Sequence, residues 1–175
     1  MNKSQLNSII IRYSALLILG ILSIKLNLFY RIFTPLTVYP VYFIIKLIHP
    51  LVQLLNNNIL SFNGFQAQIV SACVAGSAYF LLLILNLSTS MDKKTRLKSI
   101  TFLIIVFLVL NVSRIIIFSS LLFIIFKYFN FTHLFFWYFG STLLVVLIWF
   151  LNVKLFKIKN IPAYTDFKLI FKDIK

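Results

Sequence analysis

Acidic side chains are scarce in this chain, in which Asp and Glu together number 3 of 175 residues, against 17 Lys and Arg. All three acids, Asp92, Asp166 and Asp173, lie in polar stretches outside the long apolar runs. The apolar runs therefore supply neither the paired carboxylates of an intramembrane aspartyl protease nor the carboxylate oxygens of a magnesium site.

Cysteine and histidine are equally sparse. The single cysteine, Cys73, cannot form an internal disulfide, and one cysteine with two histidines, His49 and His133, makes a poor zinc site. The sequence contains no HExxH motif, no glycine-rich phosphate loop and no nucleophile elbow of a Ser-His hydrolase. We therefore expect no metal or organic cofactor.

Apolar residues, in contrast, dominate the chain. Hydrophobic residues make up 61% of it and charged residues 11%, with a mean hydropathy of +1.00. This composition predicts an integral membrane protein. A net charge of +14 would suggest a nucleic-acid partner in a soluble protein. Here it indicates span orientation and contact with anionic lipid headgroups, so no nucleic acid is expected.

The apolar runs predict an all-α, polytopic bundle of about five transmembrane segments, forming one membrane domain over residues 1–175. The second run contains Pro35, Pro40 and Pro50, which allows a kinked span, a half-span or a segment partly outside the hydrocarbon. The first run is long, contains Arg12 and lacks a small-residue cleavage pattern, so we interpret it as a span. The predicted spans are Ser8–Leu26, Ile32–Leu55, Gln66–Leu87, Ser99–Phe126 and Leu134–Val153.

Charge bias predicts how the spans are oriented. Lys and Arg concentrate in the connector 88–98 and in the tail 154–175, which places both on the cytoplasmic side of the plasma membrane. The connector 56–65 carries no charge and is assigned to the outer side. The active-site core is expected within residues 63–150, facing the extracytoplasmic side.

Three reactive side chains are predicted to reach one level near the outer face. A third span entering at Gln66 places Cys73 about 10 Å below the outer boundary, and Arg114 in the fourth span lies about 8 Å below it. His133 begins the fifth span from the same side. A thiol, a guanidinium and an imidazole are thus predicted to lie at about the same depth near the outer face.

Arg114 is the strongest single indication of function, because an arginine inside a span costs about 2.5–3.5 kcal/mol on insertion scales. Snorkelling toward headgroups is the structural alternative. Asn111 precedes Arg114 by three residues on the same helical face, where it could orient the guanidinium or a substrate.

The cysteine and the imidazole each have a structural alternative as well. A cysteine in a span is usually an inert apolar residue, but a neighbouring cation favours its nucleophilic thiolate form. Gly76 and Ser77, one turn after Cys73, are candidates for the substrate-contacting shell, or else simply pack closely against a neighbouring span. His133 would act as general acid or base, or lie in an interfacial aromatic belt.

Taken in order on three successive runs, the stretches SACVAGS (71–77), NVSR (111–114) and TH (132–133) with its aromatic run resemble the exosortase and archaeosortase family of membrane transpeptidases. The similarity is greatest to the short archaeal, pacearchaeosortase-like branch and covers residues 63–149. It implies that Cys73 is the nucleophile, Arg114 the essential arginine and His133 the third active-site residue. Ser71 departs from the acidic residue that many bacterial members have there.

The resemblance implies a cysteine-dependent protease and transpeptidase. Such an enzyme cleaves the C-terminal sorting signals of secreted precursor proteins and transfers the products to a lipid or other surface amine, without a cofactor. Two alternatives stay open. One is a non-catalytic membrane subunit that binds a partner helix or a lipid headgroup through Arg114 and Asn111. The other is an enzyme that acts on lipid phosphates through Arg114 and His133.

Overall fold

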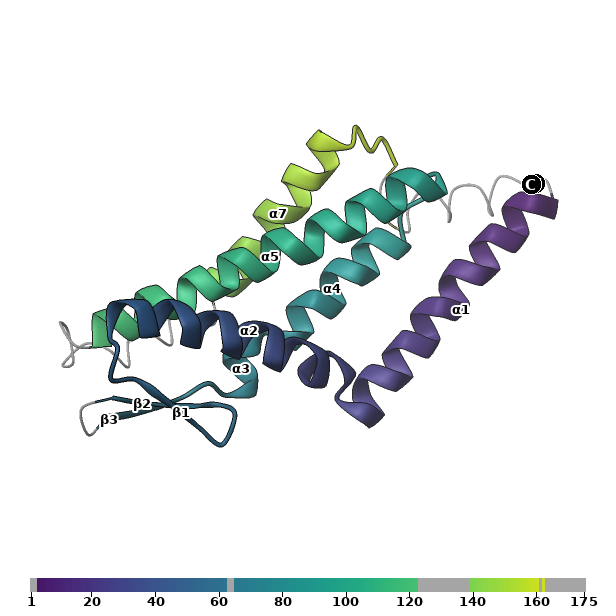
Figure 1. The fold of residues 1–175 in the computed structure, drawn as a ribbon. Helices are drawn as coiled ribbons and strands as arrows, with labels where there is room; N and C mark the ends of the chain where they lie inside the picture. The colour runs from purple at the N-terminus through teal and green to yellow at the C-terminus, as the bar shows by residue number, and fades with distance from the viewer. Residues whose placement is uncertain (1–2, 63–64, 123–138, 161, 163–175) are drawn as a thin grey trace.

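The protein is predominantly helical, as predicted (Figure 1). The computed structural model describes residues 3–62, 65–122, 139–160 and 162. Within these ranges the helices are α1 (Lys3–Leu26), α2 (Leu28–Ile48), α3 (Ser71–Val74), α4 (Gly76–Leu87), α5 (Lys93–Leu122) and α7 (Ser141–Leu155). Three short strands, β1 (Gln53–Leu55), β2 (Ile59–Phe62) and β3 (Phe65–Gln68), lie between α2 and α3.

Among the described residues, two helices are long and apolar enough to cross a membrane, namely α2 and residues Lys93–Ser119 of α5. Shorter apolar helical stretches cover Ile9–Ser23, Ser71–Leu87 and Ser141–Leu155. Many large apolar side chains face outward, with Leu47 the most exposed of them at 84%. These features associate the chain with a membrane. The five-span bundle and its orientation stay predictions.

The predicted end of the second span, Leu55, lies beyond the end of the helix in the structure. α2 runs without interruption through Pro35 and Pro40 but stops at Ile48. His49 then leaves the helical region, with φ −127° and ψ 89°, directly before Pro50. Proline disfavours the helical conformation of the residue before it and cannot donate a helical hydrogen bond. The predicted extension to Leu55 is therefore wrong, because the chain turns there and enters β1.

A small antiparallel sheet replaces the start of the third predicted span. Its strand order is β1-β2-β3, with Leu54 opposite Leu60 and Leu60 opposite Ala67. Asn56 and Asn57, between β1 and β2, both have positive φ, which asparagine tolerates better than most residues. The predicted helical start at Gln66 is wrong, because Gln66 lies in β3 and the helix begins at Ser71.

A backbone break divides the following helix into α3 and α4. Ala75 adopts a left-handed conformation, with φ 55° and ψ 42°. In an unbroken helix the N–H of Ala78 would bond the oxygen of Val74, but here it bonds the oxygen of Ala75 at 2.9 Å. The single turn α3, which carries Cys73, is thus separate from α4. The last main-chain carbonyls of α3 therefore need hydrogen-bond partners outside the helix.

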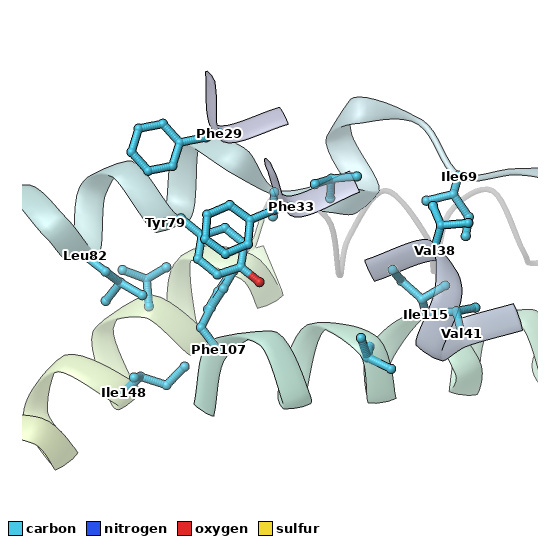
Figure 2. Packing of buried hydrophobic residues seen from close by; sticks show 14 of the residues in the cluster. Phe29, Phe33, Val38, Val41, Ile69, Tyr79, Leu82, Phe107, Ile115 and Ile148 are labelled. Atoms are coloured by element: carbon cyan, nitrogen blue, oxygen red, sulfur yellow. The ribbon is translucent and has the colours of Figure 1, made fainter. Parts of the chain in front are cut away.

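Aromatic rings join α2, α4 and α5 in the core (Figure 2). The ring of Tyr79 stacks on Phe33 at 3.6 Å between centroids and meets Phe107 edge-on at 4.7 Å. Tyr79 is fully buried. Gly76 allows α4 to approach α2, because a Cβ at this position would lie 3.3 Å from the Cβ of Phe29. This packing fixes the start of α4, and with it the cysteine turn, against α2.

Candidate active site

The thiol of Cys73 lies at the junction between the sheet and the helices. Cys73 belongs to the single turn α3, five residues after the end of β3, and its N–H bonds the oxygen of Val70 at 2.9 Å. The side chain is half-buried and makes no disulfide. It is therefore accessible from one side while the core holds its backbone.

Asn111 of α5 holds the cysteine turn. Its Nδ2 amide donates to the main-chain oxygen of Cys73 at 2.9 Å and, more weakly, to that of Val74 at 3.4 Å. These are carbonyls left over by the helix break at Ala75. Asn111 is 1% exposed, and its Oδ1 has no hydrogen-bond partner among the described residues. Of the two predicted roles of Asn111, a bond to the guanidinium is absent among the described residues and contact with a substrate stays a prediction; Asn111 positions the cysteine turn.

Arg114 lies one turn further along α5 and is half-buried. Its Nη1 donates a hydrogen bond to the hydroxyl of Ser141, the first residue of α7. The guanidinium and the Cys73 side chain are close enough to interact electrostatically. We call this group of residues (Cys73, Asn111, Arg114 and Ser141) the cysteine end of α5.

The remaining predicted site residues fall in different places. His133 lies outside the described residues. Gly76 packs against Phe29 and Tyr30 of α2, so this close approach is made to α2. Ser77 is exposed on the first turn of α4.

Ser141 was missed by the sequence analysis. Two features could have indicated it: it is a small polar residue inside the apolar run 134–153, and seven residues of helical rise put it about 10 Å below the predicted outer boundary, close to the level expected for Arg114. A hydroxyl accepts a hydrogen bond from arginine without adding charge, which suits a half-buried guanidinium. Ser141 therefore fixes the direction of Arg114 and leaves it a cation.

A second polar cluster lies about 18 Å away along α5, at the level of Ser99. Asn86 of α4 donates to the Ser99 hydroxyl at 2.6 Å, and Ser99 donates to Oδ1 of Asn152 of α7 at 2.8 Å. All three residues are fully buried. Arg96 bonds the main-chain oxygens of Asn86 at 3.0 Å and Thr89 at 2.9 Å. We call these four residues the Ser99 end.

Of the two clusters, only the cysteine end combines a thiol with a guanidinium. The buried trio of the Ser99 end has neutral amides and a hydroxyl, and Arg96 is bonded to carbonyls at the end of α4. The cysteine end has a half-buried thiol beside a half-buried guanidinium. Among the described residues no three His, Cys, Asp or Glu side chains come together as metal ligands.

Comparison with known proteins provides no relative: no family model, no curated protein and no solved structure significantly matches this chain. The function is therefore argued from the geometry of the site.

Proposed function

We propose that this protein is a membrane-embedded cysteine transpeptidase of the exosortase and archaeosortase type. In this proposal it cleaves C-terminal sorting signals of secreted precursors and transfers the product to a lipid or surface amine. One observation carries the proposal. The bond from Asn111 to the Cys73 carbonyl holds the thiol turn on α5, next to the arginine on the following turn of the same helix.

The sheet supports a position of this site at the membrane surface. A sheet with unpaired edges cannot lie in hydrocarbon, because its main-chain polar groups would have no partners there. β1–β3 therefore belong in water or among headgroups. Cys73 comes only two residues after the start of α3, about 3 Å of helical rise. This supports a thiol that lies shallower than the depth of about 10 Å that the sequence indicated.

The mechanism follows from the chemistry of the three side chains. The Cys73 thiolate attacks the scissile carbonyl, and the amine of the departing C-terminal segment leaves as the acyl-enzyme forms. Arg114 stabilises the thiolate and the negative charge that develops on the substrate oxygen. His133 protonates the leaving amine and then removes a proton from the incoming amine, which resolves the acyl-enzyme.

Cysteine labelling in intact cells tests this function first. A membrane-impermeant maleimide should label wild-type Cys73 rapidly, and Arg114→Ala should slow the labelling because the cation that favours the thiolate is gone. Arg96→Ala is the matched control, since it removes an arginine from the Ser99 end and should leave the rate unchanged.

Processing of the precursor provides the second readout. Cys73→Ala and Cys73→Ser should both abolish cleavage, a loss of at least about 10³-fold, with the fold retained. Wild-type cleavage by Cys73→Ala would refute the proposal. Labelling only after detergent treatment, at a rate indifferent to Arg114, would favour the non-catalytic subunit that uses Arg114 and Asn111 to bind a partner helix or headgroup.

A further inference from the structure

The strand next to the cysteine turn has an unpaired edge. β3 pairs with β2 on one side, and among the described residues no strand pairs with its other side. The side chains of Gln66 and Gln68 are exposed. The chain runs directly from β3 to Cys73, which follows Gln68 by five residues, at most about 18 Å of chain.

The register shows which main-chain groups point outward at this edge. Ile69 donates its N–H to the oxygen of Asn58 at 2.8 Å. Hydrogen-bonded and non-hydrogen-bonded pairs alternate in an antiparallel ladder. Ala67 opposite Leu60 is therefore a bonded pair, whereas Gln66 opposite Ser61 and Gln68 opposite Ile59 are not. The N–H and C=O groups of Gln66 and Gln68 thus point away from β2, along the unpaired edge.

The opposite edge of the sheet, formed by β1, exposes fewer main-chain groups. Leu60 directs its main-chain groups toward β3, so in β1 only Leu54, its partner, points its N–H and C=O outward. The Leu54 side chain also packs against the core. β3 therefore presents two outward residues on the side of the sheet from which the chain leads to the cysteine, and β1 presents one on the other side.

We propose that the extended cleavage motif of the precursor binds by adding a strand to the β3 edge, which aligns its scissile peptide with Cys73. This inference rests on the proposed function. Strand addition obtains affinity from main-chain hydrogen bonds, and no charged residue occurs between Pro50 and Ala72 to select a charged partner. The edge thus suits an uncharged, extended peptide segment that follows a secreted domain.

Proline substitution at an outward position tests the edge without breaking the ladder. Gln68→Pro removes an outward N–H but no bond to β2, and proline is tolerated on edge strands. The probe is a secreted reporter domain that carries a C-terminal sorting signal from the same organism. We expect KM for this reporter to rise about fivefold, as for one lost hydrogen bond, with kcat within about twofold of wild type.

Gln68→Ala is the matched comparison: it removes the side chain but keeps the outward N–H, so its KM should rise clearly less than that of Gln68→Pro. Equal KM values for both variants and wild type, with cleavage still dependent on Cys73, would overturn the edge inference and leave the function intact. Cleavage by Cys73→Ala would overturn both.

Photo-crosslinking gives a readout that does not depend on proline. Benzoylphenylalanine in place of Gln66, in the Cys73→Ala background, should form an adduct with the reporter. The same group in place of Gln53 on β1 should not. If the benzoylphenylalanine at position 66 formed an adduct with a second copy of the chain, the inference would be overturned, because this edge would then be a contact between protomers.

Discussion

The two ends of α5 use the same kinds of residue for different purposes. At the Ser99 end, the asparagines and the serine are fully buried and bond one another, and the arginine bonds backbone carbonyls. At the cysteine end, asparagine and serine each hold one reactive group, the thiol turn and the guanidinium, which stay half-exposed. The first arrangement joins α4, α5 and α7 through buried hydrogen bonds, and the second leaves a thiol and a guanidinium half-exposed.

Removal of the arginine from each end should separate these two roles most clearly. Arg114→Ala should lower kcat for precursor cleavage about 10²–10³-fold, because the developing oxyanion loses its cation. Arg96→Ala should leave kcat within about twofold and lower the melting temperature, since the end of α4 loses its hydrogen bonds. Equal losses of kcat in both variants would contradict this difference in role between the two ends of α5.

Ser99→Ala should be the most destabilising change at the Ser99 end. It leaves Nδ2 of Asn86 and Oδ1 of Asn152 buried without their present partner, which should cost about 3 kcal/mol of unfolding free energy. Denaturant titration in detergent measures this. Thr101→Val, which affects an exposed hydroxyl bonded within its own helix, is the control and should change stability by less than about 0.5 kcal/mol.

Asn111→Ala should combine a smaller loss of stability with a loss of activity. We expect about 1 kcal/mol of destabilisation and a roughly tenfold lower kcat, because the cysteine turn is no longer held on α5. The rate of maleimide labelling of Cys73 should change in parallel with kcat. Ser113→Ala, two residues away, removes only a bond to the oxygen of Val109 and should affect neither. A stability loss with unchanged kcat would make Asn111 a purely structural residue.

The smallest effect concerns Asp92, next to the Ser99 end. Its carboxylate accepts a hydrogen bond from the N–H of Thr95 at 2.9 Å, which lowers the pKa of Asp92. The ionised form is therefore favoured in the folded state, and its stabilising effect is present above pH 4, roughly the pKa of a free Asp. It should disappear as the pH falls through the lower pKa of the folded state.

A melting-temperature series from pH 6 down to pH 3 measures this effect. Asp92→Asn should reduce the slope of melting temperature against pH, because the amide caps the helix without titrating. A slope unchanged by this substitution would assign the pH dependence to other groups.

The sequence was sufficient for the predominantly helical class, and it singled out Arg114 and Asn111 as candidates. Hydropathy runs identify apolar helices because their length and composition alone are diagnostic. Arg114 attracted attention because a charge in an apolar run is costly, and Asn111 because three residues of spacing put it on the same face. What Asn111 bonds could not be inferred, because its partner is a main-chain oxygen released by a helix break 36 residues earlier, at Ala75.

The sheet was missed because hydropathy windows do not register short hairpins. The strands contain enough apolar residues to extend the neighbouring runs, as in the predicted spans that ended at Leu55 and began at Gln66. Two local signals could have corrected this: the asparagine run 56–58 and the Asn63-Gly64 dipeptide between two short apolar segments. Each is a turn signal, and together they delimit β2.

The bonds at the cysteine end also bear on the order of synthesis. Asn111 and Cys73 are 38 residues apart in the chain, and Arg114 and Ser141 are 27 apart. Chains emerge from the ribosome N-terminus first, so neither bond can form while the first helices are being made. The thiol turn lacks its hydrogen bond from Asn111 until α5 is made, and the guanidinium lacks its bond to Ser141 until α7 begins. The cysteine end is therefore completed only after residue 141 has been synthesised.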